Sequence, residues 1–292
     1  MTTSAQLRSG KGSGDENFPV ASWLIKPQHR PAILAFYEFV RVADDIADHP
    51  KLGSDEKIAR LDRLEASLLG NGGDDLEGIT LRNVLNKRGL SPRHAQDLLN
   101  AFRQDAIKLR YANWDELIDY CSRSAMPVGR FVLDVHDESR DTWPANDALC
   151  AALQIINHLQ DCAKDYRNLD RVYIPLDVLK ASGASVEELN DKQASPALMV
   201  CLRGLTARTA ELLQQSQSFA ASINDTRLAL EVSVIQALAN RLLTILAVRD
   251  PLSQIVHLSK TQALAMAASS STRALLRRLL RTRAPAHGYQ TP

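Results

Sequence analysis

Apolar residues recur at helical spacing along most of this 292-residue chain. Within residues 55–69, for example, Ile58, Leu61 and Leu64 fall on one face of a helix. Very few segments alternate between apolar and polar residues, as a half-buried β-strand would. The pattern therefore predicts an all-α protein and excludes a sheet as its main architecture.

Turn signals and prolines divide the chain into predicted helices. Pro127 is expected to kink the helix that contains it, because proline removes a backbone donor and crowds the preceding turn. Residues 172–175 indicate a short extended link. The expected helices are Pro31 to Ala47, Asp55 to Leu69, Leu76 to Asn86, Ser91 to about Leu109, Asp115 to His136, Ala145 to Asn168, a short one beginning at Ser185 to Glu188, Pro196 to Ala221, Thr226 to Arg249, and Leu252 to about Thr282.

No linker divides the chain. We expect one helical domain over residues 15–284, a disordered polar lead-in over residues 1–14, and a tail over residues 285–292. No stretch reaches the ~18 to 20 apolar residues that span a bilayer, and the N-terminus lacks the apolar core of a signal peptide. We therefore predict a cytoplasmic protein. The net charge of +1 creates no field that favours nucleic acid, so no nucleic-acid partner is expected.

Two segments carry a narrow polar stripe on an otherwise apolar helix. Residues three and four apart lie on the same helical face, so each stripe is a single row of side chains. The first stripe, in residues 35–48, consists of Tyr37, Arg41, Asp44 and Asp48. The second, in residues 154–165, consists of Gln154, Asn157, Asp161 and Asp165.

Each stripe has an ordinary interpretation as the solvated side of an amphipathic helix. A solvated side usually mixes Lys with Glu, whereas these stripes consist mainly of Asp, Asn, Gln and Tyr. Asp is also a poor residue for a helix interior, so a repeated Asp-x-x-x-Asp opposes local propensity. The presence of two such motifs favours a binding function over coincidence.

Paired Asp-x-x-x-Asp helices suit the binding of Mg²⁺ and a diphosphate. Mg²⁺ prefers oxygen ligands and is usually held by one or two carboxylates together with substrate phosphates. Two facing helices of this kind can hold metal ions that make the diphosphate a better leaving group. An apolar cavity below the acidic rim would receive a hydrocarbon tail and keep water away from a carbocation.

Three motifs, in this order and spacing, resemble the squalene/phytoene synthase family over about residues 16–249. They are AFYEFVRVADDIAD at 35–48, YCSRSAMPVG at 120–129 and QIINHLQDCAKDYRNLDRVYIP at 154–175. The resemblance implies an isoprenoid-synthase-type helical bundle around a central cavity, Mg²⁺ as cofactor and an isoprenoid diphosphate as substrate. Within the family, NFPVAS, RYANWDELIDYC and SAMPVGR are most similar to the bacterial hydroxysqualene synthases of the hopanoid pathway, although Met126 replaces their usual Asn.

That subgroup's reaction would be the ionisation of presqualene diphosphate, with loss of diphosphate and capture of the rearranged cation by water. One alternative is a presqualene diphosphate or squalene synthase that condenses two farnesyl diphosphates. A rival from another class is a non-catalytic helical assembly factor. Such relatives tend to lose the aspartates, and all four are present here.

The resemblance also implies residue roles. The implied metal ligands are Asp44, Asp48, Asp161 and Asp165, and the implied catalytic residues are Asp44, Asp161 and Tyr120. Many family members have Arg where this chain has Gln160, so a positive charge that would contact the diphosphate is absent here. Hydroxysqualene synthases often share this change. The residues expected to contact substrate are Phe18, Tyr37, Arg41, Gln154, Asn157, Gln160, Arg171 and Tyr173.

Other residues leave alternatives open. Tyr120 and Phe18 are also explained by ordinary core packing. The segment from Arg273 to Arg283 is basic and amphipathic, which is typical of a solvated terminal helix or of one that lies on an anionic membrane. A hydrocarbon substrate and product favour transient membrane contact and contact with pathway enzymes. The histidines that lack metal-ligand spacing, interpreted as structural or surface residues, are His136, His158 and His257.

Overall fold

The computed structural model describes residues 24–283. Helices account for 73% of these residues, and the only strand-like pairing among them is an isolated parallel bridge between Arg110 and Val172. The prediction of an all-α fold is confirmed. Phe18 and the predicted segments 1–14 and 285–292 lie outside the described residues.

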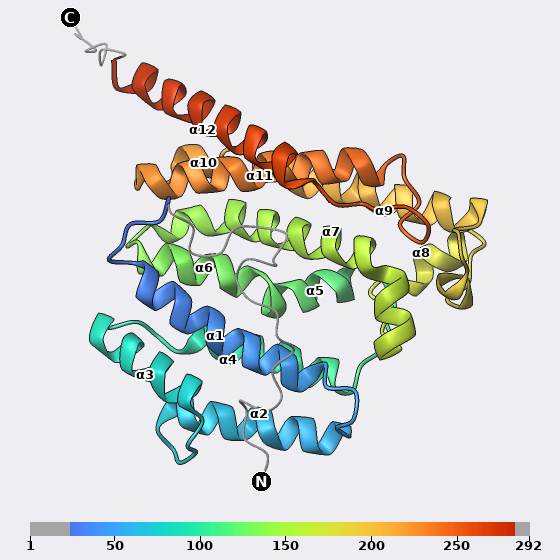
Figure 1. Ribbon diagram of the computed structural model, residues 1–292, viewed down its shortest axis with the longest axis horizontal. Coiled ribbons are helices and arrows are strands. Elements are labelled where there is room, and N and C mark those ends of the chain that lie inside the picture. The colour runs from blue at the N-terminus through green and yellow to red at the C-terminus, as the bar shows by residue number, and fades with distance from the viewer. Residues whose placement is uncertain (1–23, 284–292) are drawn as a thin grey trace, which may run out of the picture.

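Twelve α-helices and two short 3₁₀ turns follow one another in the described part of the chain. The helices are α1 (Arg30–Ala47), α2 (Ser54–Leu69), α3 (Leu76–Arg88), α4 (Arg93–Asp105), α5 (Trp114–Ser124), α6 (Met126–Val135), α7 (Trp143–Leu169), α8 (Leu176–Ala181), α9 (Pro196–Gln215), α10 (Phe219–Ser222), α11 (Thr226–Leu246) and α12 (Lys260–Arg283), and the 3₁₀ turns are Arg140–Thr142 and Glu187–Asn190. In Figure 1 the helices α1 to α4 form one side of the bundle, α5 to α7 the middle and α9 to α12 the other side.

The two helices that carry the polar stripes lie on the cavity side of the bundle. In α1, Ala32, Phe36, Phe39 and Ala43 pack into the core, and Pro31 occupies the first turn, where it costs no hydrogen bond. The 27 residues of α7 make a rod of about 40 Å. It is therefore long enough to reach from the acidic end of the bundle to the opposite end.

Two predicted helices are shorter than expected. The helix that starts near Ser91 ends at Asp105, because the following residues pair with the link after α7: Val172 N–H donates to Leu109 C=O at 2.9 Å. The predicted helix with the kink is two helices, α5 and α6, separated at Ala125 (φ −125°, ψ −47°). Pro127 lies in the first turn of α6, where proline is tolerated.

The predicted start of the last helix at Leu252 is wrong, since α12 begins at Lys260. The Asp250 carboxylate accepts hydrogen bonds from the Leu252 N–H at 2.8 Å and the Ser253 hydroxyl at 2.6 Å. Such local bonds to the backbone compete with helix formation. The other differences are smaller: the predicted helix Pro196 to Ala221 is divided into α9 and α10, and the one begun by Ser185 to Glu188 is a single 3₁₀ turn.

One helix in the described range, α11, is long and apolar enough to cross a membrane by composition alone. Of its most apolar stretch, 56% is buried inside the bundle. Its buried residues Leu228, Val232 and Leu242 belong to the same hydrophobic core as Phe36 and Phe39 of α1. The apolar character of α11 is therefore used in packing within the bundle.

Candidate active site

A cavity of about 560 Å³ lies between α1, the α4–α7 region and α11. Its walls are apolar over most of their length. At one end it is acidic, where the C-terminal halves of α1 and α7 meet the link after α7. The main apolar wall residues are Ile33, Phe36, Val40, Val132, Leu133, Leu149, Leu153 and Val232.

Both polar stripes face this cavity. The two Asp-x-x-x-Asp motifs therefore meet at one site, as their stripes predict, while the roles assigned to the individual residues stay predictions. The candidate residues that line the cavity are Tyr37, Arg41, Asp44, Asp48, Tyr120, Gln154, Asn157, Asp161, Asp165, Arg171 and Tyr173.

The first stripe is held by an arginine on its own helix. Arg41 donates to Asp44 at 2.7 Å and to the buried Asp45 at 2.9 Å, which lie one helical turn further along α1. Desolvation, and then the charge of Asp48, raise the pKa of Asp44 to about 7 despite Arg41. The cavity thus crowds negative charge at this point, and an added cation would favour the ionised form of Asp44.

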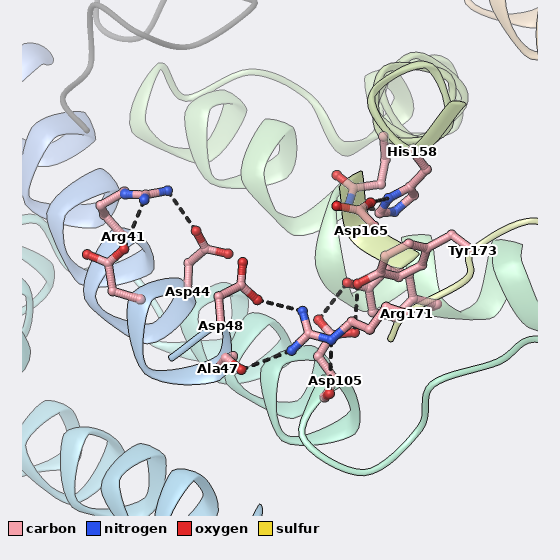
Figure 2. Close-up of polar contacts among 12 residues, drawn as sticks. Arg41, Asp44, Ala47, Asp48, Asp105, His158, Asp165, Arg171 and Tyr173 are labelled. Carbon is pink, nitrogen blue, oxygen red and sulfur yellow. Dashed lines mark hydrogen bonds and ion pairs between the residues drawn. The ribbon is translucent and has the colours of Figure 1, made fainter. Parts of the chain in front are cut away.

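Arg171 joins the end of α1 to the opposite side of the site (Figure 2). Its guanidinium donates to the Asp48 carboxylate at 2.5 Å, to the Ala47 carbonyl at 2.9 Å and to the Asp105 carbonyl at 3.2 Å. Only 5% of Arg171 is exposed. A buried arginine with its donors so occupied fixes the position of Asp48 at the acidic end.

Asp105, at the end of α4, is a cavity residue that the sequence analysis missed. Its carboxylate accepts hydrogen bonds from the Tyr120 hydroxyl at 2.7 Å and the Tyr173 hydroxyl at 3.1 Å. A sequence signal existed, since Asp105 follows the core residues Leu98 and Ala101 at helical spacing and so falls on the buried face of α4. Desolvation raises the pKa of Asp105 to about 6, although Arg171 and the two hydroxyls oppose the rise.

Aromatic rings surround the Asp105 carboxylate. The rings of Tyr120 and Tyr173 lie 5.4 Å apart, and the His158 ring stacks on Tyr173 with centroids 3.5 Å apart and an interplanar angle of 16°. His158 Nδ1 also lies 3.9 Å from the Asp165 carboxylate (Figure 2). His158 therefore lines the site and is not a surface residue, while its interpretation from sequence as a structural residue stays a prediction.

The expectation that Gln160 contacts the diphosphate is not supported by its placement. Its side-chain amide donates to the Val256 carbonyl and, at 3.3 Å, to His257 Nδ1, both in the segment between α11 and α12. Successive helical residues are 100° apart, so Asp161 can face the cavity while Gln160 faces that segment. Gln160 therefore packs α7 against the chain that precedes α12.

The donor chemistry at the acidic end fits Mg²⁺. The side chains there offer carboxylate and amide oxygens, which are the ligands that Mg²⁺ prefers. No three His, Cys, Asp or Glu side chains in the described range already form a group that could hold a metal. Mg²⁺ is commonly held by one or two carboxylates and completed by phosphate oxygens and water, so the donor set fits an ion that arrives with a diphosphate.

The hydrogen bond between Tyr120 and Asp105 leads to a testable expectation. Replacing Tyr120 with Phe removes one of the two hydroxyl donors that favour the ionised carboxylate, so the pKa of Asp105 is expected to rise above about 6. The measurement is an NMR titration of protein with ¹³C-labelled Asp carboxyls. Tyr111→Phe is the control, because the Tyr111 hydroxyl interacts with Gln104 and should leave the Asp105 titration unchanged.

The same carboxyl affects stability in a defined pH window. Its pKa rises from an ordinary 3.8 to about 6 in the folded protein, so between these values the native state keeps a proton that the unfolded chain has lost. The contribution of Asp105 to the free energy of unfolding must therefore decrease as the pH rises through this window. In the titration experiment, an Asp105 carboxyl that titrates at the same pH in Tyr120→Phe as in the native protein would show that the Tyr120 hydrogen bond does not influence its pKa.

Comparison with solved structures supports the fold. A dehydrosqualene synthase solved with a ligand aligns with a TM-score of 0.77 at 20% identity, covering 94% of this chain and 96% of that one. A squalene synthase from Alicyclobacillus acidocaldarius aligns with a TM-score of 0.68 at 24% identity, covering 93% of each chain. At these identities the likeness concerns the fold alone, which is the same all-α bundle.

Sequence comparison is more specific. The hydroxysqualene synthase of Rhodopseudomonas palustris is 62% identical over 258 residues, which is 88% of each chain. That of Sinorhizobium fredii is 56% identical over 264 residues, which is 90% of each chain. The family model described as squalene/phytoene synthase matches residues 12–262. This chain therefore belongs to the squalene/phytoene synthase family.

Proposed function

We propose that this protein is a hydroxysqualene synthase. The observation that carries the proposal is its 62% identity to the hydroxysqualene synthase of R. palustris over 88% of both chains. The substrate would be presqualene diphosphate and the product hydroxysqualene. A long apolar cavity with an acidic end suits a molecule with hydrocarbon chains and a diphosphate head.

At the acidic end, the ligands of Mg²⁺ would be Asp44, Asp48, Asp161 and Asp165, with Asn157 beside them. When bound there, Mg²⁺ would neutralise the diphosphate and make it a better leaving group. Arg41 and Arg171, which now pair with the carboxylates of α1, bring positive charge to the same end. Their role would be to orient the diphosphate head toward α1 and α7.

Beyond the acidic end, the cavity would protect the carbocation. Its apolar walls keep water from the reacting chain, and the ring of Tyr120, which is not stacked on His158 as that of Tyr173 is, would offer the negative quadrupole that attracts a cation. The Asp105 carboxylate lies against both tyrosine hydroxyls and orients the two rings. These groups would favour ionisation without themselves attacking the cation.

Capture by water requires a polar group inside the apolar part of the cavity. Ser124 lines it, and its buried hydroxyl has no hydrogen-bonding partner among the described residues. Asn146 reaches the same wall because residue 129 is glycine; a Cβ there would stand 1.9 Å from the Asn146 amide oxygen. We infer that Ser124 and Asn146 hold the water that becomes the product hydroxyl.

The test is product analysis in ¹⁸O-labelled water. With presqualene diphosphate, Mg²⁺ and no nicotinamide, the protein is expected to form hydroxysqualene that carries the label, because the hydroxyl oxygen comes from water. Ser124→Ala is expected to shift the products toward unlabelled alkenes formed by proton loss, because cation capture depends on what is placed nearby. Mass spectrometry of the extracted lipids measures both results.

Two outcomes would contradict the proposal. One is squalene formed only when NADPH is added, and the other is presqualene diphosphate accumulating from farnesyl diphosphate without further reaction. Either would identify the protein as a squalene or presqualene diphosphate synthase and leave its family unchanged. We further propose that the enzyme works in the cytoplasm, at or near the membrane that would receive its hydrocarbon product.

A further inference from the structure

The last part of the chain has a charge unlike the rest. After Asp250 there is no Asp or Glu, and the basic residues there include Arg273, Arg277 and Arg278 within α12. The whole chain has a net charge of only +1, so the part before α12 is net negative. Positive charge is thus concentrated on one helix.

The same helix exposes an apolar face, which we call the α12 leucine face. Four of its members, at positions 275, 276, 279 and 280, follow the spacing of adjacent helical turns and so form one continuous strip. Exposed leucines in this arrangement mark an interaction surface when basic residues flank them. The members and their exposures are Leu264 70%, Leu275 43%, Leu276 55%, Leu279 50% and Leu280 69%.

Arg278 fixes the orientation of α12 on the bundle. Its guanidinium donates to the carbonyls of Ile223 at 2.9 Å and Asn224 at 2.8 Å, at the corner between α10 and α11. Arg278 therefore faces the bundle, while Leu276 and Leu280, roughly half a turn away around the helix, face outward. In Figure 1 this end of α12 extends past α10.

The corner that Arg278 holds also forms the apolar end of the cavity. Phe219 and Leu228, on either side of it, line the cavity together with Ile33 of α1. Ile33 and Asp48 are fifteen helical steps apart, which places this end about 22 Å from the acidic end. The α12 leucine face thus lies beside the tail end of the cavity, away from the aspartates.

We propose that the α12 leucine face docks on an anionic membrane surface and brings the tail end of the cavity to the lipid. The leucines would enter the interface while the arginines of α12 other than Arg278 contact lipid phosphates. Charge selects this occupant over a second copy of the chain, because two such basic helices repel each other. The benefit of docking rests on the proposed function, since its substrate and product are hydrocarbons.

Vesicle sedimentation with the full chain tests the docking. The protein is expected to bind vesicles of phosphatidylglycerol and phosphatidylcholine in equal parts at least about tenfold more tightly than vesicles of phosphatidylcholine alone, and to dissociate at high salt. The double variant Leu279→Glu, Leu280→Glu should lose most of this binding. Val200→Glu is the matched control, because Val200 is 62% exposed on α9 and should leave binding unchanged.

Circular dichroism and gel filtration of each variant complete the test. Equal binding by the double variant and the native chain would overturn the proposal. So would a native dimer that the double variant converts to a monomer, since the leucines would then cover each other. Turnover of detergent-dispersed presqualene diphosphate is expected to stay within about twofold in the double variant. If the native chain binds vesicles but does not turn over presqualene diphosphate, the proposed function is refuted and the docking proposal is not.

Discussion

Replacing Asp161 with Asn is expected to lower the turnover of presqualene diphosphate by more than about a hundredfold. Changes to residues that only orient metal ligands cost 10 to 100-fold, and a lost ligand should cost more. The Asp161 carboxylate makes no hydrogen bond or ion pair with another described residue, so the fold should not depend on its charge. Steady-state kinetics at saturating Mg²⁺, with circular dichroism of the same sample, measures both effects.

Asp44→Asn is expected to give the same loss, because Asp44 belongs to the matching motif on α1. Asp119→Asn is the control: Asp119 is an exposed aspartate on α5 that, within residues 24–283, pairs only with Arg123 one turn away. It should keep the native rate. Native turnover in either cavity variant would mean that the polar stripes are solvated helix faces with no part in the reaction.

Replacing Arg171 with Leu is expected to reduce the free energy of unfolding by about 3 to 5 kcal/mol. Most of this cost comes from two buried carbonyl oxygens that lose their donor, at about 1 to 3 kcal/mol each, because the Asp48 side chain is 41% exposed and can be hydrated. Here the change would leave Asp48 without its cation, and the carbonyls of Ala47 and Asp105 without their donor. Urea unfolding followed by circular dichroism provides the measurement.

Arg123→Gln is the comparison for that experiment. Arg123 pairs with Asp119 on the surface of α5, where ion pairs contribute about 1 kcal/mol or less. Equal losses in the two variants would show that burial does not strengthen the Arg171 contacts. Because Arg171 also lines the cavity, its variant is expected to lose turnover as well, so the unfolding experiment is the decisive one.

The features predicted from sequence are those set by local spacing. The helix expected from Pro31 to Ala47 differs from α1 by one residue, because its apolar pattern and its N-terminal proline agree. The stripes on α1 and α7 could be found because both repeat every three or four residues. Their meeting at one cavity followed from two matching motifs, and their order along the chain pointed to the family.

The features that were missed depend on contacts between distant residues. Asp105 is surrounded by Tyr120 and Tyr173, which are 15 and 68 residues away, and nothing local to Asp105 identifies those partners. Gln160 turns from the cavity because a segment almost a hundred residues later accepts its hydrogen bonds. Residues 252–259 have helical spacing, but α12 begins only at Lys260, and the first two of these residues bond to the Asp250 side chain instead.

The arginines of the acidic end also bear on how this protein matures in a cell. Asp44 and Asp48 each have a guanidinium within 2.7 Å, so the chain supplies counter-ions of its own. A newly made molecule can therefore complete its pocket before any divalent ion or lipid reaches it. Loading in the proposed enzyme then becomes an exchange, in which each arginine releases a carboxylate and receives an oxygen of the incoming diphosphate. Removing the divalent ion with a chelator would then stop turnover reversibly and leave the fold intact.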